Sequence, residues 1–252
     1  MNYTSGYYHV IRLTAQIPKR CSVAVSGGAD SLCLLDFVAR SGREVVALHY
    51  DHGTGSTPAA LPYIQSVCDR YGVELRASEP LVAPRPRCYS PESWWREQRY
   101  RWLQQQSDHV LTAHNLNDQA ETWLMGSIQG QPKLIQPVVQ WESMTVSRPL
   151  LATSRSDVET YCIQNGISWW DDPANTDHDY LRVRVRETIL PAALTINPGL
   201  LNTLRKKTLD LARSRRYTSE TLAAVVESVD TRDLKSLALE RASSSLASGT
   251  KF

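Results

Sequence analysis

Short apolar runs alternate with helix-like segments along the chain, and this alternation constrains the fold most. The runs have the length and the apolar or β-branched composition of buried strands and lie at 21–26, 44–50, 73–78 and 109–114. Segments with a helical pattern lie at 32–42, 58–72, 92–106, 117–130 and 154–166. Strands that alternate with helices pair in parallel, so we predict an α/β protein with a doubly wound, mainly parallel sheet.

The remaining segments predict loops, one more strand region and a helical end. Residues 79–91 contain four prolines and are expected to form a loop, whereas 131–153 contains a strand or a hairpin. From Pro198 onward the pattern is helical, without a strand-like run. We therefore expect a large domain at 1–197 and a small helical C-terminal appendage at 198–252.

The composition is that of an ordinary globular protein, with 42% hydrophobic and 21% charged residues. No apolar run approaches the roughly 18 residues of a membrane span, and the N-terminal segment lacks the apolar stretch of a signal peptide. We expect a cytoplasmic protein with no membrane partner. The five cysteines have no CxxC spacing, which argues against a disulfide framework, a zinc site and most iron–sulfur ligation.

The net charge of +2 hides a basic segment. Residues 182–216 contain nine Lys and Arg against two acidic residues, a local balance of +7, which leaves −5 for the rest. Either this segment binds a polyanion such as RNA, or its charges form a solvated helical face. The candidates for phosphate contacts are Arg182, Arg184, Arg186, Arg205, Lys206 and Lys207.

The motif SGGADS, residues 26–31, lies between a predicted strand and a predicted helix. Its two glycines let backbone amides approach a ligand, and a helix N-terminus adds N–H donors and a positive dipole end. This favours a phosphate ligand over the alternative, a glycine turn with an Asp cap. The loop is neither a Walker A motif nor a GxGxxG fingerprint. Asp30 is expected to hold Mg²⁺ or to lock the loop through backbone N–H groups.

A second motif, AHNLNDQAET at 113–122, ends a predicted strand and opens a helix. Asp118 and Glu121 are three residues apart and share a helix face, and His114 comes just before the helix. Ligands of open α/β sheets bind at the carboxyl ends of the strands, so two carboxylates here would hold an ammonium group. The alternative is a first helical turn that is merely enriched in acids.

SGGADS resembles the signature of the PP-loop ATP pyrophosphatases, and AHNLNDQAET resembles a motif of the tRNA isoleucine lysidine synthetase family within that superfamily. Further matches follow in the family's order: LHYDHG at 48–53, REQRY at 96–100, RPLL at 148–151, WDDPAN at 170–175, DYLR at 179–182 and ILP at 189–191. The resemblance spans roughly residues 20 to 200 and implies the PP-loop (adenine nucleotide alpha hydrolase-like) type of α/β fold.

The resemblance also implies a two-step ligase reaction on the wobble cytidine of an isoleucine tRNA, in its anticodon region. ATP adenylates the cytosine ring and pyrophosphate leaves, and the ε-amine of free L-lysine then displaces AMP to give lysidine. ATP and Mg²⁺ are the expected cofactors. The implied ATP-binding residues are Ala24, Val25, Ser26, Gly27, Gly28, Ala29, Asp30, Ser31 and His49.

The implied catalytic residues come from both motifs and from the REQRY segment. Asp30 would hold the metal or lock the loop, and Asp118 and Glu121 would bind and deprotonate the amine. His114 would lie near the reacting centre. Arg99 would stabilise the nucleotide or the activated intermediate, with Arg96 as the alternative register.

The sequence departs from the family pattern at several positions. Asn115 stands where many relatives have a second histidine, and Asn117 where many have the first of two aspartates. These changes bear on the identity of the nucleophile more than on the use of ATP. The alternatives are a PP-loop tRNA thiolase, which normally needs a pair of cysteines, and a non-catalytic tRNA-binding homologue, against which the retained Asp30, Asp118 and Glu121 argue. The sequence leaves the oligomeric state open.

Overall fold

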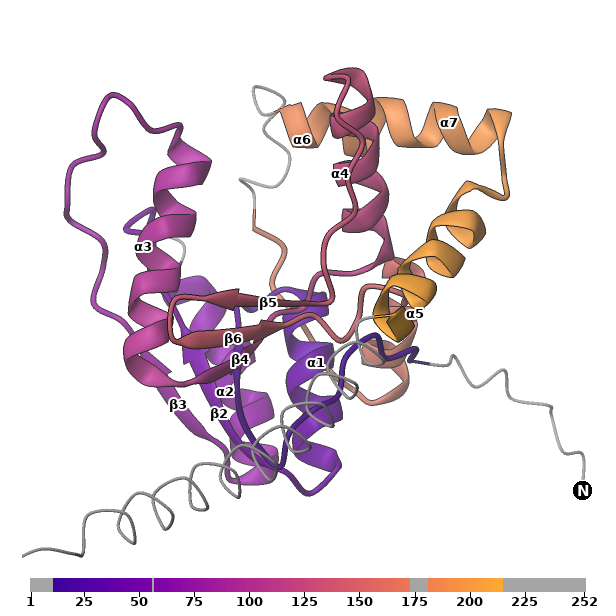
Figure 1. The fold of residues 1–252 in the computed structure, drawn as a ribbon. Helices are drawn as coiled ribbons and strands as arrows, with labels where there is room; N and C mark the ends of the chain where they lie inside the picture. Colours follow the sequence, from indigo (N-terminus) through magenta and orange to yellow (C-terminus); the bar gives the residue numbers. More distant parts are fainter. Residues whose placement is uncertain (1–10, 56, 173–180, 215–252) are drawn as a thin grey trace, which may run out of the picture. The chain divides into compact units, whose positions relative to one another are not determined.

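The computed structural model describes residues 11–55, 57–172 and 181–214. Six strands form one sheet in the order β3-β2-β1-β4-β6-β5 (Figure 1). The strands are β1 Arg20–Ala24, β2 Glu44–His49, β3 Glu74–Ala77, β4 His109–Leu111, β5 Val138–Trp141 and β6 Met144–Ser147. All neighbouring strands run parallel except β5 and β6, which form an antiparallel hairpin at the edge. The predicted fold class is confirmed.

Helices connect the parallel strands and continue after the sheet. They are α1 Ala29–Arg40, α2 Thr57–Tyr71, α3 Pro91–Gln106, α4 Leu116–Ile128, α5 Arg155–Gln164, α6 Leu181–Arg184, the π-helix η2 Val185–Ile189 and α7 Leu190–Ile196. Residues 200–214 are helical as well. Beyond residue 166, the sequence pattern predicts helix only from Pro198 onward, so the helical run at 181–196 was not predicted.

The sheet is covered on both faces because its strands alternate apolar side chains between two cores. Along β2, Val45 and Ala47 pack into one core with α1, α2 and α5, whereas Val46 and Leu48 pack into the other with α3. A third core joins Leu116 and Ala120 of α4 to Leu190 of α7 and to Leu204. Helix α4 therefore extends from the sheet into the helical part of the chain.

Strand order places the ligand-binding end of the sheet. From β1 the chain moves one way through β2 and β3 and then returns to put β4 on the other side of β1. Open α/β sheets bind ligands at the carboxyl ends of the strands at such a switch point. Both predicted motifs begin there, because α1 follows β1 and α4 follows β4.

The chain divides into two compact units, Met1–Leu209 and Asp210–Phe252. The first contains the whole sheet and the helices α1 to α7. The division expected between residues 197 and 198 stays a prediction. In the part of the chain that the structure describes, no helix has the length and apolar character needed to cross a membrane.

Candidate functional site

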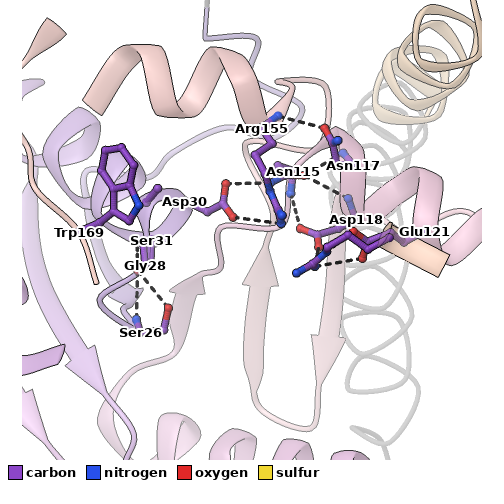
Figure 2. Close-up of polar contacts among 12 residues, drawn as sticks. Ser26, Gly28, Asp30, Ser31, Asn115, Asn117, Asp118, Glu121, Arg155 and Trp169 are labelled. Atoms are coloured by element: carbon purple, nitrogen blue, oxygen red, sulfur yellow. Dashed lines mark hydrogen bonds and ion pairs between the residues drawn. The ribbon is translucent and has the colours of Figure 1, made fainter. Parts of the chain in front are cut away.

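The SGGADS loop joins β1 to α1 in a tightly fixed conformation (Figure 2). Ser31 Oγ accepts the Ser26 N–H at 3.1 Å and donates to the Gly28 carbonyl at 2.9 Å. Gly27 has a φ of +89°, and a Cβ at this position would lie 2.9 Å from Ala60 Cβ on α2. Residue 27 must therefore be glycine both for its backbone conformation and for its close packing.

A pocket of about 860 Å³ opens at the carboxyl ends of β1, β2 and β4. Ten of the predicted site residues line it: Ala24, Val25, Ser26, Asp30, Ser31, His49, Arg99, His114, Asp118 and Arg182. A second hollow of about 580 Å³, at the opposite ends of the strands, is lined by none of them. The structure thus brings three residues of the SGGADS loop and Asp118 to one cavity, whereas Gly27, Gly28 and Ala29 are not among the lining residues.

Asn115 connects the two motifs. Its side-chain Oδ1 accepts the backbone N–H groups of Asn117 at 2.8 Å and Asp118 at 3.1 Å, which caps α4. Its Nδ2 donates to Asp30 Oδ1 at 2.8 Å, and Figure 2 shows the Asp30 carboxylate directed toward it. Asp118 Oδ2 completes a capping box by accepting the Asn115 N–H at 2.9 Å. One buried amide thus fixes Asp30 and the start of α4 together.

Asn117, the second departure from the family pattern, contacts α5. Its Oδ1 accepts the Arg155 N–H at 3.0 Å. The Arg155 guanidinium in turn lies 4.0 Å from Asp30 Oδ2. Sequence reasoning missed both Asn115 and Arg155 as partners of Asp30. The spacing of Asn115 and Asp118 is that of a capping box, which could have indicated the helix start, whereas the bond to Asp30 is a tertiary contact.

Asp30 has unusual electrostatics for a carboxylate beside a helix N-terminus. The pKa of Asp30 is raised to about 6, because burial and then the nearby negative charge of Asp118 raise it more than Arg155 and the Asn115 amide lower it. A carboxylate with a raised pKa among other charged groups in a cleft is typical of functional sites. Asp30 and Asp118 are therefore a like-charge pair whose repulsion a bound cation would relieve.

Glu121 lies outside the pocket, although it was expected to share the amine role with Asp118. Its side chain is fully buried and accepts two hydrogen bonds from Arg186, Nε to Oε1 at 2.7 Å and Nη2 to Oε2 at 3.2 Å. Burial raises the pKa of Glu121, and Arg186 opposes that rise. Arg186 was expected to contact tRNA phosphates, but its guanidinium group instead forms an ion pair with Glu121.

The other predicted basic residues differ in their accessibility. Arg184, Lys206 and Lys207 are exposed. Arg205 is partly buried, and its guanidinium donates to the Ala152 carbonyl at 3.0 Å and to Asn202 Oδ1 at 2.8 Å. Among the described residues, the three exposed side chains form no hydrogen bond or ion pair like those of Arg186 and Arg205.

Three histidines line the pocket, and two of them, His49 and His114, are predicted site residues. Burial lowers the pKa of His114 to about 3, and its Nδ1 lies 3.1 Å from Thr112 Oγ1. His49 is buried and its Nδ1 lies 2.9 Å from the Val25 carbonyl, so that nitrogen carries the hydrogen. His114 is thus neutral at physiological pH and can donate or accept a hydrogen bond without carrying charge.

Three arginines surround Tyr100 on the α3 side of the pocket. The Arg96 guanidinium carbon lies 4.5 Å and that of Arg99 5.7 Å from the centre of the Tyr100 ring. Burial lowers the pKa of both Arg99 and Arg148, and the charge of Arg96 lowers both further. Within the described ranges none of the three is ion-paired to a carboxylate. Clustered cations without acidic partners favour a bound anion.

The fold and the site together define a doubly wound α/β protein with a glycine-rich anion loop at its switch point. A family model for the PP-loop domain matches residues 7–193, and the chain belongs to that family.

Within this family, the chain is similar in sequence to tRNA(Ile)-lysidine synthases. The chain is 36% identical over 222 residues to a tRNA(Ile)-lysidine synthase of Salinispora arenicola, which covers 81% of this chain and 64% of that protein. It is 30% identical over 178 residues to the tRNA(Ile)-lysidine synthase of Corynebacterium glutamicum, which covers 70% of this chain and 56% of that protein. The chain thus spans between half and two thirds of these relatives' length.

A solved structure shares the fold. The U34-tRNA thiolase NcsA of Methanococcus maripaludis, a protein with a [4Fe-4S] cluster, superimposes with a TM-score of 0.60 at 17% identity and covers 77% of this chain and 72% of its own. At this identity the likeness shows the α/β architecture alone.

Proposed function

We propose that the protein is an ATP-dependent tRNA-modifying ligase of the lysidine synthetase type. It adenylates the wobble cytidine of an isoleucine tRNA and replaces AMP by the ε-amine of lysine. One observation carries this proposal: side chains of the SGGADS loop line the same pocket as Asp118, and Asn115 hydrogen-bonds to both Asp30 and Asp118. The similarity to lysidine synthases over most of the chain supports the same activity.

The loop residues Ser26 to Ser31 bind the two departing phosphates of ATP. The backbone around Gly27 and Gly28 and the start of α1 supply the anion cradle. Ala24, Val25 and His49 lie around the adenosine, because they line the same pocket next to the loop. Arg99 faces the charge that develops on the α-phosphate.

Asp30 fits a Mg²⁺ ion. Mg²⁺ is usually bound by one or two carboxylates together with substrate phosphates and water, and Asp30 lines the pocket at the start of α1, beside the loop proposed to bind phosphate. The ion would neutralise charge on the departing pyrophosphate. Within residues 11–55, 57–172 and 181–214, no group of three His, Cys, Asp or Glu side chains forms a metal site, so phosphates and water would complete the coordination.

Asp118 orients the lysine ammonium and accepts its proton before attack. Its position is fixed by the capping box at the start of α4. His114, neutral in this environment, forms a hydrogen bond near the reacting ring. These two side chains line the pocket beside the loop, so the amine meets the adenylated base where it is formed.

The tRNA backbone contacts Arg184, Lys206 and Lys207, which are exposed, and Arg182 at the pocket wall. An enzyme that acts on tRNA works where tRNA is charged and translated, so we place the protein in the cytoplasm. The thiolase alternative has less support. Four of the five cysteines are buried, and the exposed one, Cys88, lies in the proline-rich loop away from them in sequence.

The direct test is to incubate the protein with ATP, Mg²⁺, lysine and bulk bacterial tRNA and to measure AMP release and nucleoside masses. We expect lysine-dependent AMP release and a cytidine heavier by one lysine minus water. AMP release without that product would preserve the adenylation site and point to another nucleophile. A protein that binds tRNA without nucleotide turnover would be the non-catalytic homologue.

A further inference from the structure

The buried Glu121 carboxylate is closed off from the pocket by an internal cation. Arg186 bonds to both of its oxygens, and the Glu121 side chain is fully buried. Asp118, one helical turn earlier on α4, lines the pocket, whereas Glu121 does not. The two carboxylates of the motif therefore face different surroundings.

A second arginine lies on the same side of the same helical run. Arg182 and Arg186 are four residues apart, so they share a face, and Arg182 Nε lies 4.0 Å from Glu121 Oε2. Arg186 also lies 3.8 Å from Asp118 Oδ1 and sits in the π-helical turn η2. Such turns are frequent at functional sites. Two guanidinium groups thus balance two carboxylates.

We propose that Arg186 is a positioning residue that decides which carboxylate meets the amine; this inference rests on the proposed function. It holds Glu121 inside the protein, so that Asp118 is the α4 carboxylate that receives the incoming ammonium group. A substrate amine could reach Glu121 only by displacing a bidentate guanidinium, and the partly buried Arg186 would then lose its partner.

The proposal predicts a specific pattern of Michaelis constants for lysine. In Glu121→Gln, the unpaired Arg186 lies close enough to pair with Asp118 and compete with the amine. The KM for lysine should then rise about tenfold or more while adenylation continues. In the double variant Glu121→Gln/Arg186→Gln the competing cation is absent, so the KM should return to within about threefold of wild type. Arg186→Lys should retain more activity than Arg186→Gln.

The opposite pattern would overturn the proposal. If Glu121 bound the amine itself, Glu121→Gln and the double variant would raise the KM for lysine equally. Asp118→Asn serves as the reference, because the loss of lysine transfer in this variant should not be relieved by any change at Arg186.

A thermal double-variant cycle separates this inference from the proposed function. Each single Gln variant should lower Tm by about 6 °C or more, and the double variant by clearly less than the sum. The exposed pair Arg20–Glu44, with side chains 82% and 55% exposed, is the control and should show little coupling. If the wild-type protein did not transfer lysine, the proposed function would be wrong, but the Tm cycle would still test the pairing of Glu121 with Arg186. If the Tm losses of the two single variants were additive, that pairing would be rejected.

Discussion

The side-chain amide of Asn115 donates to the carboxylate of Asp30 across 85 residues of sequence, at 2.8 Å. The oxygen of the same amide accepts backbone N–H groups at the start of α4 and so caps that helix. Because one side chain bonds to both the SGGADS loop and the helix that carries Asp118, it holds the two motifs together. Under the proposed function, this bond would join the groups for both chemical steps in a single site.

Asn115→Ala should destabilise the protein by about 2 kcal/mol, since it removes a helix cap and a hydrogen bond to a partly buried carboxylate. Urea unfolding measures the change. Ser90→Ala is the matched control, because the Ser90 side chain caps α3 through exposed bonds to the backbone N–H and hydroxyl of Ser93 and bonds to no other residue in the described part of the chain. Equal losses in the two variants would refute the bridging role of Asn115.

Gly27→Ala should weaken ATP binding at least about tenfold, because the added Cβ meets Ala60 and the left-handed backbone becomes strained. Calorimetric titration with ATP measures the dissociation constant. Gly42→Ala shares the positive φ, at +73°, but meets nothing within 4 Å and lies after α1, so it should cost stability while ATP binding is kept. Loss of affinity in both variants would indicate a general effect of strain.

The stability of the protein should depend on pH through Asp30. Its pKa is raised from 3.8 to about 6, first by burial and then by Asp118. Between these values the folded state keeps a proton that the unfolded state has lost, so this stability is present below pH 4 and is lost as pH rises through about 6. Without ligands, Asp30→Asn should therefore be more stable than wild type at pH 8, by on the order of 2 kcal/mol.

Thermal melts of wild type and Asp30→Asn at pH 4 and pH 8 check this dependence. The difference between the two proteins should be large at pH 8 and should nearly vanish at pH 4. A difference of the same size at both values would mean that Asp30 has an ordinary pKa in the folded protein.

Arg99→Met should lower kcat/KM for ATP by about tenfold or more without lowering Tm, because it removes a cation that has no acidic partner within the described ranges from a cluster that favours an anion. Arg101→Met on the same helix is the control, since Arg101 is 64% exposed and pairs with Glu97. Steady-state kinetics with varied ATP distinguish the two variants. Equal losses in both would point to a general effect on α3.

Much of this fold could be predicted because its signals are local. The alternation of Val45, Val46, Ala47 and Leu48 between two cores is visible as a short apolar run, and the glycine-rich loop marks the end of β1. The helical run at 181–196 was missed because its β-branched residues and Pro191 obscure the helical period. Pro191 lies in the first turn of α7, where proline is tolerated.

The parts of the site that escaped prediction depend on tertiary partners. Spacing puts Asp118 and Glu121 on one helix face, but it does not show that Arg186 arrives from a later helix to enclose one of them. In the same way, Asn115 and Asn117 stand out in the sequence as departures from a family pattern. Their contacts to Asp30 and to Arg155 exist only once α1, α4 and α5 are assembled.

The most direct measurement follows both chemical steps in wild type and in Asp118→Asn, with labelled ATP and labelled lysine on the same tRNA. Wild type should join lysine to the tRNA and release AMP. Asp118→Asn should still attach AMP to the tRNA but should transfer lysine at least about 100-fold more slowly, because the base that prepares the amine is lost while the phosphate loop is intact. Lysine transfer by Asp118→Asn at the wild-type rate would contradict the assignment of the amine site.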